Sequence, residues 1–556
     1  MKLFWTVFKA YTYRDKVLSA FAIVVLLLMV VKMMLFPYGL FGFGSDEIYT
    51  EGIVAKNGIQ NLNPLFTDYN EADREVSRLI FSGLMKYDPV NKAIVDDVGT
   101  LTISGDKKEY SFKIREGIRF HDGDFLTADD VYFTFAAVVQ NPAFQNEVLR
   151  TNFEGVDIQL IDEMTIKFIL PRPNIFFISN LTTGILPEHI LGEVEPDRIL
   201  EADFNKQPVG SGPYMVNDPV SSFSSGRMQI TLERNPYYYE KPSEIEFIRF
   251  VAFPSIEKLV EDVNSVNAVV KVTGEYFDFF EQNERFELIP YELPQYLAVY
   301  FNMDSPLLKD QQKVRLALQK AVDKEELIAG RKDLIRVDTP LLELDQKDWL
   351  YQSSKEQAQG ALKDAGYNYQ AEDVDKVGVR YNEDDEALEL KLLARAYDEG
   401  TPQFTETLGV VDFLQNSWEE IGFSIQVEFL PLQQFNEAVM SRQYDLLLVG
   451  QNLGYNLDTY SYWHSTQATP LGQNFSNYRS FQADALIENV RTIFDPTVRE
   501  EKLLALANSL RDDVPAVFLY RPVYYYAIDS KVEGVALDSL VFPSDRFFRV
   551  GEWRFK

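Results

Sequence analysis

The chain has 556 residues, and its 85 acidic against 54 basic residues give a net charge of −31. This balance argues against a nucleic-acid partner, because phosphate binding requires clustered lysine and arginine. The complete absence of cysteine excludes disulfides, thiolate zinc sites, cysteine nucleophiles and a lipid-modified cysteine anchor.

Residues 17–36 predict a transmembrane helix. The segment VLSAFAIVVLLLMVVKMMLF has one charge, Lys32, and 20 helical residues span about 30 Å, the thickness of the hydrocarbon core. Basic residues precede it, namely Lys2, Lys9, Arg14 and Lys16. We therefore expect a single-pass cell-membrane protein with a cytoplasmic N-terminus and an extracytoplasmic bulk. A cleaved signal peptide is the competing interpretation, although its apolar region would be shorter, about 7–15 residues. A buried core helix is the third.

Local patterns in the first half of the chain indicate mixed α/β structure. Residues 110–114 (YSFKI) alternate as a half-buried strand should, and they predict a pair with Leu101-Thr102-Ile103 across a turn. Thr127-Ala128-Asp129-Asp130 resembles a capping box that opens an apolar helix over 131–139.

Two further helices are expected downstream. Apolar residues over 309–329 fall near one helical face, lysine and glutamate cover the other, and Gly330 ends the pattern. A shorter helix over 355–365 begins after Ser354 and ends before Gly366.

The stretch 388–450 is the most informative for architecture. It reads as strand, helix, strand, helix and strand over 388–397, 404–421, 424–430, 433–442 and 445–450. Strands that alternate with helices predict a parallel sheet, whose ligands bind beyond the carboxyl ends of the strands. The loop 451–465, QNLGYNLDTYSYWHS, follows the last of these strands, so ligand contacts are expected there first.

No catalytic motif is present in the sequence. There is no GxxxxGK[ST] phosphate loop, no HExxH and no G-x-S-x-G elbow, and the three histidines are widely separated. We therefore expect no catalytic residues, no metal site and no cofactor, and we do not expect an enzyme.

Four stretches, taken together, resemble a known family. They are RLIFSGLMKYDP at 78–89, KEYSFKIREGIRFHDGDFLTADDVYFTF at 108–135, PVGSGPY at 208–214, and LAVYFNMDSPLLKDQQKVRLALQKAVDKEELI at 297–328. Their order and spacing are similar to the family 5 extracytoplasmic solute-binding proteins, the dipeptide-, oligopeptide- and nickel-binding receptors of ABC importers. The resemblance runs from about Asn61 to about Pro522.

The resemblance implies a large family-5 form of the type II periplasmic-binding-protein-like α/β fold, with two lobes and an extra subdomain. The expected organisation is a basic flank and transmembrane anchor in 1–40, lobe I in 45–290 with an inserted subdomain at about 76–190, lobe II in 298–512, and a return to lobe I in 513–556. The two crossings are expected near 293–301 and 514–522.

Two of the motifs resemble a catalytic pair and a phosphate-binding loop, but a structural role is the favoured interpretation of each. Phe120-His121-Asp122-Gly123 resembles a catalytic His-Asp pair, yet the family uses it as a turn element, and Asp-Gly favours a tight turn. Gly210 and Gly212 lack the following lysine-bearing helix of a phosphate loop, so backbone turns are the favoured interpretation.

Six residues are predicted to bind the ligand: Asn302, Tyr455, Asn456, Asp458, Tyr460 and Trp463. Enclosed pockets combine aromatic walls with a few placed polar groups, which the loop 451–465 supplies. Core packing is the alternative for each aromatic side chain. For Asn302, which ends a crossing strand, capping of the next loop is equally open.

The loop also departs from the family pattern. Peptide receptors place an aspartate here to pair with the peptide's α-ammonium, and the equivalent position falls on Gly454. Either Asp458 takes over that role, or the free N-terminus is not recognised, because a desolvated ammonium without a carboxylate partner is costly.

The resemblance implies a monomeric, membrane-anchored receptor that binds oligopeptides between its lobes and delivers them to an ABC permease with a separate ATPase. Capped peptides, sugars and nickel complexes remain open as ligands. An anchored sensor or scavenger without transport is the alternative function.

Overall fold

The structure is a computed structural model that describes residues 48–556, apart from 68–69, 275, 345, 371–377, 400, 456 and 538. The predicted anchor, 17–36, and the predicted ligand contact Asn456 therefore lie outside the described residues. Within the described part of the chain, no helix combines the length and apolarity needed to cross a bilayer.

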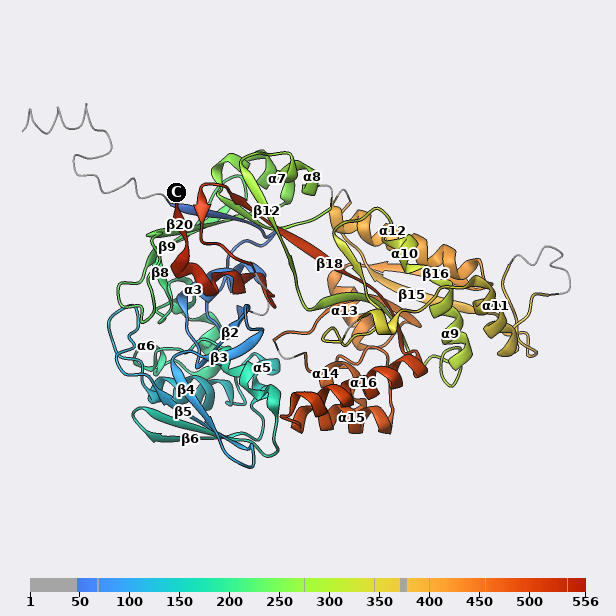
Figure 1. Ribbon diagram of the computed structural model, residues 1–556, viewed down its shortest axis with the longest axis horizontal. Coiled ribbons are helices and arrows are strands. Elements are labelled where there is room, and N and C mark those ends of the chain that lie inside the picture. Colours follow the sequence, from blue (N-terminus) through green and yellow to red (C-terminus); the bar gives the residue numbers. More distant parts are fainter. Residues whose placement is uncertain are drawn as a thin grey trace, which may run out of the picture.

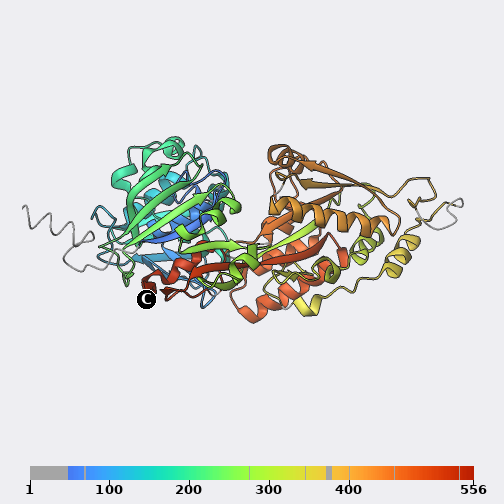
Figure 2. The ribbon, with the colours of Figure 1, turned by 90° about the horizontal axis from the view of Figure 1, so that it is seen from above.

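The hydrophobic core divides the molecule into two bodies (Figures 1 and 2). Buried side chains from 49–293 and 526–553 pack in one pair of clusters, and those from 296–520 pack in another pair. We call these the first body and the second body. Figure 2 shows extended segments running between them.

One long mixed sheet passes through both bodies, in the order β16-β15-β17-β13-β18-β11-β1-β10-β9-β8, with β12 and β14 also paired to β18. Its strands in the first body are β1 (Tyr49–Val54), β8 (Tyr214–Ser222), β9 (Met228–Arg234), β10 (Phe247–Phe253), β11 (Ala268–Val272) and β12 (Phe286–Glu292). Those in the second body are β13 (Gln295–Phe301), β14 (Leu334–Arg336), β15 (Glu389–Arg395), β16 (Ser424–Leu430) and β17 (Leu446–Asn452).

Strand β18 (Ala516–Asp529) joins the two bodies. Its first residues pair with β13, where Tyr300 lies opposite Ala516, and its last residues pair with β12, where Phe286 lies opposite Asp529. Phe518 belongs to a core cluster of the second body and Tyr526 to one of the first body. A single strand therefore contributes to both cores.

The predicted parallel arrangement over 388–450 is confirmed. Strand β15 pairs in parallel with β16 and with β17, and the connecting helices are α12 (Pro402–Glu419) and α13 (Leu432–Met440). The sheet as a whole is mixed, because β13 is antiparallel to β17.

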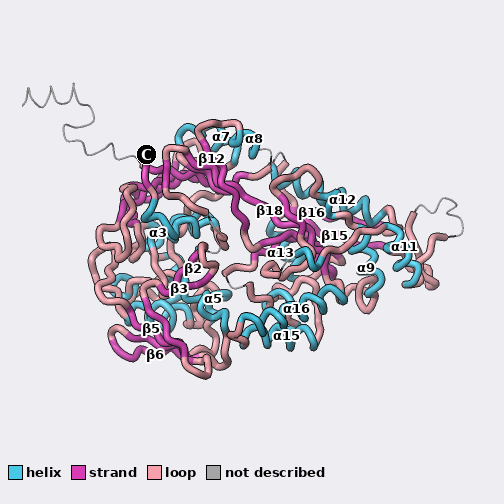
Figure 3. Tube along the Cα trace, viewed as in Figure 1, coloured by secondary structure: helices cyan, strands magenta, loops and turns pink. Residues whose placement is uncertain are grey.

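The first body also carries smaller sheets (Figure 3). A four-stranded antiparallel sheet has the order β4-β5-β7-β6, and two-stranded pairs join β2 to β3 and β19 to β20. These strands are β2 (Met85–Asp88), β3 (Ala93–Asp96), β4 (Gly99–Ile103), β5 (Glu109–Ile114), β6 (Asp157–Asp162), β7 (Thr165–Ile169), β19 (Val532–Glu533) and β20 (Arg554–Phe555). The predicted hairpin is confirmed, since Leu101 lies opposite Phe112.

The remaining helices cover the sheets. In the first body they are α3 (Glu71–Ile80), α4 (Ala128–Tyr132), α5 (Glu147–Asn152), α6 (Glu188–Leu191), α7 (Ile256–Glu261), α8 (Tyr276–Glu281), and 3₁₀ turns η3 (Ile175–Thr182), η4 (Pro196–Glu201), η5 (Asp203–Lys206), η6 (Val263–Ser265) and η9 (Pro543–Glu552). In the second body they are α9 (Gln312–Ala321), α10 (Lys324–Leu327), α11 (Lys355–Asp364), α14 (Tyr460–Trp463), α15 (Phe481–Thr492), α16 (Pro496–Asp513), and 3₁₀ turns η7 (Gln346–Trp349) and η8 (Ser465–Gln467).

The predicted capping box at Thr127 is confirmed, but the helix after it is not a regular α-helix. Asp130 accepts a hydrogen bond from the Thr127 backbone N–H at 2.9 Å. The chain then continues from α4 into a π-helical segment, η2 (Phe133–Val139).

The single helix expected over 309–329 is wrong, because α9 ends at Ala321 and α10 begins at Lys324. Asp323 accepts hydrogen bonds from the backbone N–H groups of Glu325 and Glu326, so it caps a new helix instead of continuing the old one. The expected solvent-facing lysine is also wrong at Lys324, whose side chain is only 2% exposed.

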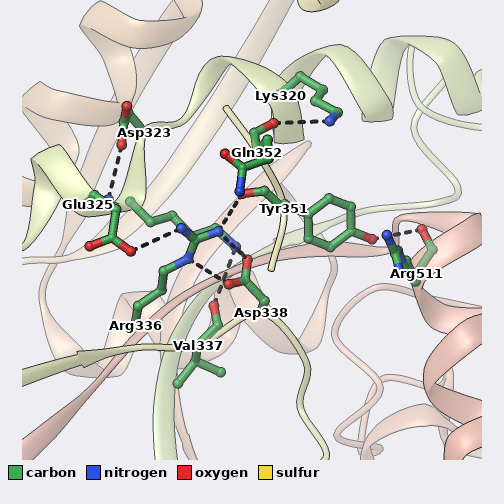
Figure 4. Close-up of polar contacts among 10 residues, drawn as sticks. Lys320, Asp323, Glu325, Arg336, Val337, Asp338, Tyr351, Gln352 and Arg511 are labelled. Carbon is green, nitrogen blue, oxygen red and sulfur yellow. Dashed lines mark hydrogen bonds and ion pairs between the residues drawn. The ribbon is translucent and has the colours of Figure 1, made fainter. Parts of the chain in front are cut away.

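Lys324 enters a buried polar network in the second body. Its ammonium lies 2.5 Å from Asp338, whose other oxygen lies 2.6 Å from Arg336. Figure 4 shows Arg336 between Glu325 and Asp338, close to Tyr351. Burial lowers the pKa of Lys324 to about 8, against the opposing effect of Asp338.

Candidate ligand-binding site

The loop that follows β17 reaches from the second body to the first. Tyr455, on this loop, packs its ring against Tyr87 at 5.2 Å and against Phe542 at 4.9 Å between ring centroids. Its hydroxyl donates a hydrogen bond of 2.6 Å to Oδ1 of Asp545 in η9. Parallel strands deliver their following loops to one edge of a sheet, which explains why this loop meets the opposite body.

Asp545 is a buried acceptor held by three hydrogen bonds. It is fully buried, and its Oδ2 accepts the backbone N–H groups of Val541 and Phe542 at 3.0 and 2.8 Å. Burial raises the pKa of Asp545 although Arg78 and these donors oppose the shift. The Tyr455–Asp545 contact is therefore a desolvated polar bond between the two bodies.

Other contacts also connect the bodies, among them a hydrogen bond of 3.2 Å from the Gly274 N–H to Oδ2 of Asp333. Lys56 lies 2.6 Å from Asp398, with both side chains about three-quarters exposed, so this pair adds little stability. Lys107 lies over the ring of Phe494 at 5.4 Å.

A cavity of about 120 Å³ lies beside the Tyr455 contact. It is lined by Pro64, Thr67, Arg74, Ser77, Arg78, Phe81, Leu149, Thr182, Thr183, Gly184, Tyr455, Phe542 and Ser544. Tyr455 alone among these belongs to the second body. The cavity thus lies between the bodies, and its described lining carries arginine, hydroxyl and apolar groups.

Helix α3 presents the two arginines of this cavity. Asn70 caps the helix by accepting a hydrogen bond from the Ala72 N–H. Acidic residues occupy the first turn, where they stabilise the helix by interacting favourably with its dipole. Its far end contacts the segment 210–212, where the N–H of Gly212 donates to Ile80 O at 2.8 Å.

Gly210 and Gly212 are required by this close approach. A Cβ on Gly210 would lie 2.1 Å from Ile80 O, and one on Gly212 would lie 2.5 Å from Leu79 O. The glycines of the VGSGPY motif therefore let the backbone pack against the end of α3, directly after Arg78.

The Phe120–Gly123 motif is structural, as predicted. Nδ1 of His121 accepts the Gly210 N–H at 3.1 Å, and its Nε2 lies 3.2 Å from Gly212 O. Gly123 adopts a φ of 99° at the turn. Burial lowers the pKa of His121 to about 4, so the ring is neutral.

Arg78 is the distinctive cation of the cavity. Its half-buried guanidinium has no hydrogen-bond or ion-pair partner among the described residues, whereas the Arg74 guanidinium lies over the ring of Phe542 at 4.2 Å. Burial disfavours the charged form, but the neighbouring Tyr455 and Asp545 outweigh it and raise the pKa of Arg78. The group is therefore a permanent positive charge.

The structure distributes the predicted site residues over different roles. Asp458 lies 3.2 Å from Nε of Arg491, and its Oδ1 accepts the Tyr460 N–H. Tyr460 stacks on His464 at 4.2 Å between ring centroids, with the guanidinium of Arg491 4.4 Å from its ring. Of the described predicted residues, Tyr455 is the one that lines the cavity.

Asn302 and Trp463 are buried within the second body. Oδ1 of Asn302 accepts hydrogen bonds from Asp304 N and Asn477 Nδ2, and its Nδ2 donates one to Tyr444 O. These bonds match the alternative interpretation, in which Asn302 caps the loop that follows its strand. Trp463 is 1% exposed in a core cluster, which is the packing alternative. These contacts give both side chains structural roles in the described conformation, and their contacts with a ligand stay predictions.

Sequence inspection did not single out Arg78, Phe542 or Ser544. Arg78 opens the RLIFSGLMKYDP stretch, but a lone arginine on an amphipathic helix is usually solvent-exposed. Phe542 and Ser544 reach the cavity only because the C-terminal tail returns to the first body.

Comparison with known proteins identifies the relatives of this arrangement. The family described as bacterial extracellular solute-binding proteins, family 5 Middle, matches residues 92–473. The oligopeptide-binding protein AppA of Bacillus subtilis is 25% identical over 504 residues, covering 87% of this chain and 88% of that protein. The di/tripeptide-binding protein 1 of Pseudomonas aeruginosa is 24% identical over 511 residues, covering 85% and 89%.

Solved structures share the fold. NikZ from Campylobacter jejuni, in complex with Ni(L-His), superposes with a TM-score of 0.75 at 23% identity, covering 92% of this chain and all of that one. AppA from Bacillus subtilis, in complex with a nonapeptide, gives a TM-score of 0.71 at 22% identity, covering 91% and 99%. The chain therefore has the α/β periplasmic-binding-protein-like fold.

Proposed function

The chain belongs to family 5 of the bacterial extracellular solute-binding proteins, and we propose that it is a peptide receptor that supplies an ABC importer. The main support is the cavity between the two bodies, which lies beside the Tyr455–Asp545 contact. Relatives named for oligopeptide and di/tripeptide binding align over most of this chain. The receptor binds without chemistry and hands its cargo to a permease with a separate ATPase.

The two bodies act as lobes that close on the ligand. We assign 45–290 with the return segment 513–556 to lobe I, which includes the subdomain at about 76–190, and 298–512 to lobe II. The separate core clusters and the strand β18 that joins them support this division. In a hinge closure of this kind, the ligand shifts the open–closed equilibrium toward the closed form by the extra affinity that it has for that form.

The receptor is a monomer held at the cell surface by residues 17–36, with its N-terminus in the cytoplasm. Tethering keeps it near its permease and raises the effective concentration without additional contacts. Membrane fractionation tests this part, because full-length protein in the soluble or secreted fraction would contradict it.

The free peptide N-terminus is not read by Asp458. That carboxylate already faces Arg491 and the Tyr460 N–H, and Gly454 offers no alternative charge. Asp458→Asn is therefore expected to weaken binding of a peptide and of its N-acetylated form by the same factor. A loss confined to the free form would restore Asp458 as the ammonium partner.

Native mass spectrometry of the full chain, purified in detergent from its host, tests the ligand class. We expect a ladder of co-purified peptides, and we expect added oligopeptides to raise the melting temperature of the stripped protein. Recovery of a sugar or a nickel complex, with no thermal response to any peptide, would refute the proposal.

A further inference from the structure

Among the described residues, the positive charge of Arg78 has no hydrogen-bond or ion-pair partner, and the two acids that act on it, Asp545 and Asp97, have partners of their own. Asp545 accepts three hydrogen bonds, from Tyr455, Val541 and Phe542. Asp97, the other nearby acid, accepts the Tyr239 hydroxyl at 2.7 Å and lies within 4 Å of basic side chains, namely those of Lys86 and Arg115. The guanidinium therefore keeps its donors available.

The described lining of the cavity contains no carboxylate that could neutralise Arg78 directly. It offers instead the hydroxyl side chains of Thr67, Ser77, Thr182, Thr183 and Ser544. A guanidinium with neighbouring hydroxyl groups presents the donors that a carboxylate accepts, and the planar fork of arginine matches a carboxylate in a bidentate manner.

We infer that this cavity is a carboxylate-binding subsite, in which Arg78 pairs with a carboxylate of the bound peptide. The inference rests on the proposed peptide-receptor function and names the group by which the ligand is held. The carboxylate comes either from the peptide C-terminus or from an acidic side chain, since both present the same group to Arg78.

The size and charge of the cavity favour this group over the alternatives. A cavity of about 120 Å³ has room for a carboxylate group and is small for a whole peptide. An ammonium is excluded, because it would be desolvated beside Arg78 with no carboxylate in the described lining to compensate.

Arg78 is a binding residue in this proposal, whereas the competing role is long-range compensation of Asp545 and Asp97. The two roles predict a different dependence of the binding affinity on the carboxylate of the peptide. A purely structural arginine would alter the affinity for every peptide equally, while a carboxylate partner discriminates between an acid and its amide.

The test is calorimetric titration of the full chain in detergent with three alanine tetrapeptides: the free acid, the C-terminal amide, and an amide carrying one glutamate. We expect a tetrapeptide that carries the bound carboxylate to bind about 10- to 100-fold more tightly than the plain amide, as for a charged hydrogen-bonded pair. Tighter binding of the free acid than of the plain amide identifies the C-terminus as the source, and tighter binding of the glutamate-bearing amide than of the plain amide identifies a side-chain source.

Arg78→Gln is expected to bind all three tetrapeptides as weakly as wild type binds the plain amide. Arg78→Lys keeps the charge without the fork and should fall between wild type and Arg78→Gln. Arg554→Gln, which breaks a half-exposed pair with Glu533, is the matched control and should behave as wild type. Thermal melts of all three variants verify folding.

Two outcomes overturn the inference and are distinguishable. If wild type binds all three tetrapeptides equally, or if Arg78→Gln weakens binding of all three by the same factor, the subsite is wrong while the peptide receptor stands. If wild type binds none of the tetrapeptides and none of the longer peptides, the proposed function fails and takes the subsite with it.

Discussion

Replacing Tyr455 by phenylalanine removes one hydroxyl and keeps the ring that packs against Tyr87 and Phe542. The hydroxyl donates to the fully buried carboxylate of Asp545 at 2.6 Å, across the two bodies. A hydrogen bond to a charged group contributes about 1.5–3 kcal/mol. Asp545 keeps its two backbone donors, so we take about 2 kcal/mol as the loss from the closed form.

This loss is expected to weaken ligand binding. About 2 kcal/mol corresponds to a roughly 30-fold shift of the open–closed equilibrium toward the open form. Because the apparent dissociation constant rises as the binding-competent fraction falls, the affinity of Tyr455→Phe should drop by up to that factor. Small-angle scattering of the ligand-free protein should show a larger radius of gyration than in wild type.

Tyr462→Phe is the matched control, because its hydroxyl donates to Asn452 O at 2.9 Å within the same body. It should leave both the affinity and the radius of gyration unchanged. Equal affinities and equal scattering for the two variants would refute the role of Tyr455 as a closing contact.

Three further predictions concern stability and pH. Lys324→Met removes the ammonium that pairs with the fully buried carboxylate of Asp338, while Arg336 remains as a partner. We therefore expect the free energy of unfolding, measured by urea denaturation, to fall by about 3 kcal/mol, the lower end of the range for a broken buried pair. A fall below about 1 kcal/mol would contradict the burial argument. In the folded protein His121 is neutral because its pKa is lowered to about 4, whereas in the unfolded chain it takes up a proton near pH 6.5. Its contribution to the free energy of unfolding is therefore complete above pH 6.5 and is lost between pH 6.5 and 4, by at most about 3 kcal/mol. His121→Gln should flatten this part of the plot of stability against pH, and parallel plots for wild type and variant would exclude the effect. Trp463→Ala should cost about 3–5 kcal/mol because the side chain is a core residue, and the milder Trp463→Phe should not change ligand affinity; a large affinity change without destabilisation would return Trp463 to the binding site.

Local signals predicted much of the secondary structure. Alternation at 110–114 and the strand–helix order over 388–450 are confirmed by the strand pairings, because period-2 patterns and capping residues act within a few positions of the chain. The helix over 309–329 was predicted as continuous because apolar periodicity persists through it, yet the short-range capping by Asp323 interrupts the backbone.

The site was only partly predictable. Tyr455 could be proposed because it follows a strand whose end faces a ligand in parallel sheets, and the structure places it on the cavity. Asp458, by contrast, is engaged by Arg491, a partner 33 positions away that no local pattern connects to it. The distinction between an aromatic core residue and an aromatic wall, as for Trp463, also depends on neighbours from other elements.

The amino-acid sequence by itself determined the acidic, cysteine-free chemistry of the chain, the alternation of strands and helices over 388–450, and the family to which it belongs. These follow from composition and from residues close together in the chain. The tertiary structure alone decided that Arg78 meets Tyr455 and the C-terminal tail around one cavity. The reason is physical: an arginine is an ordinary surface cation until distant segments enclose it, occupy the nearby acids and leave its donors to a ligand.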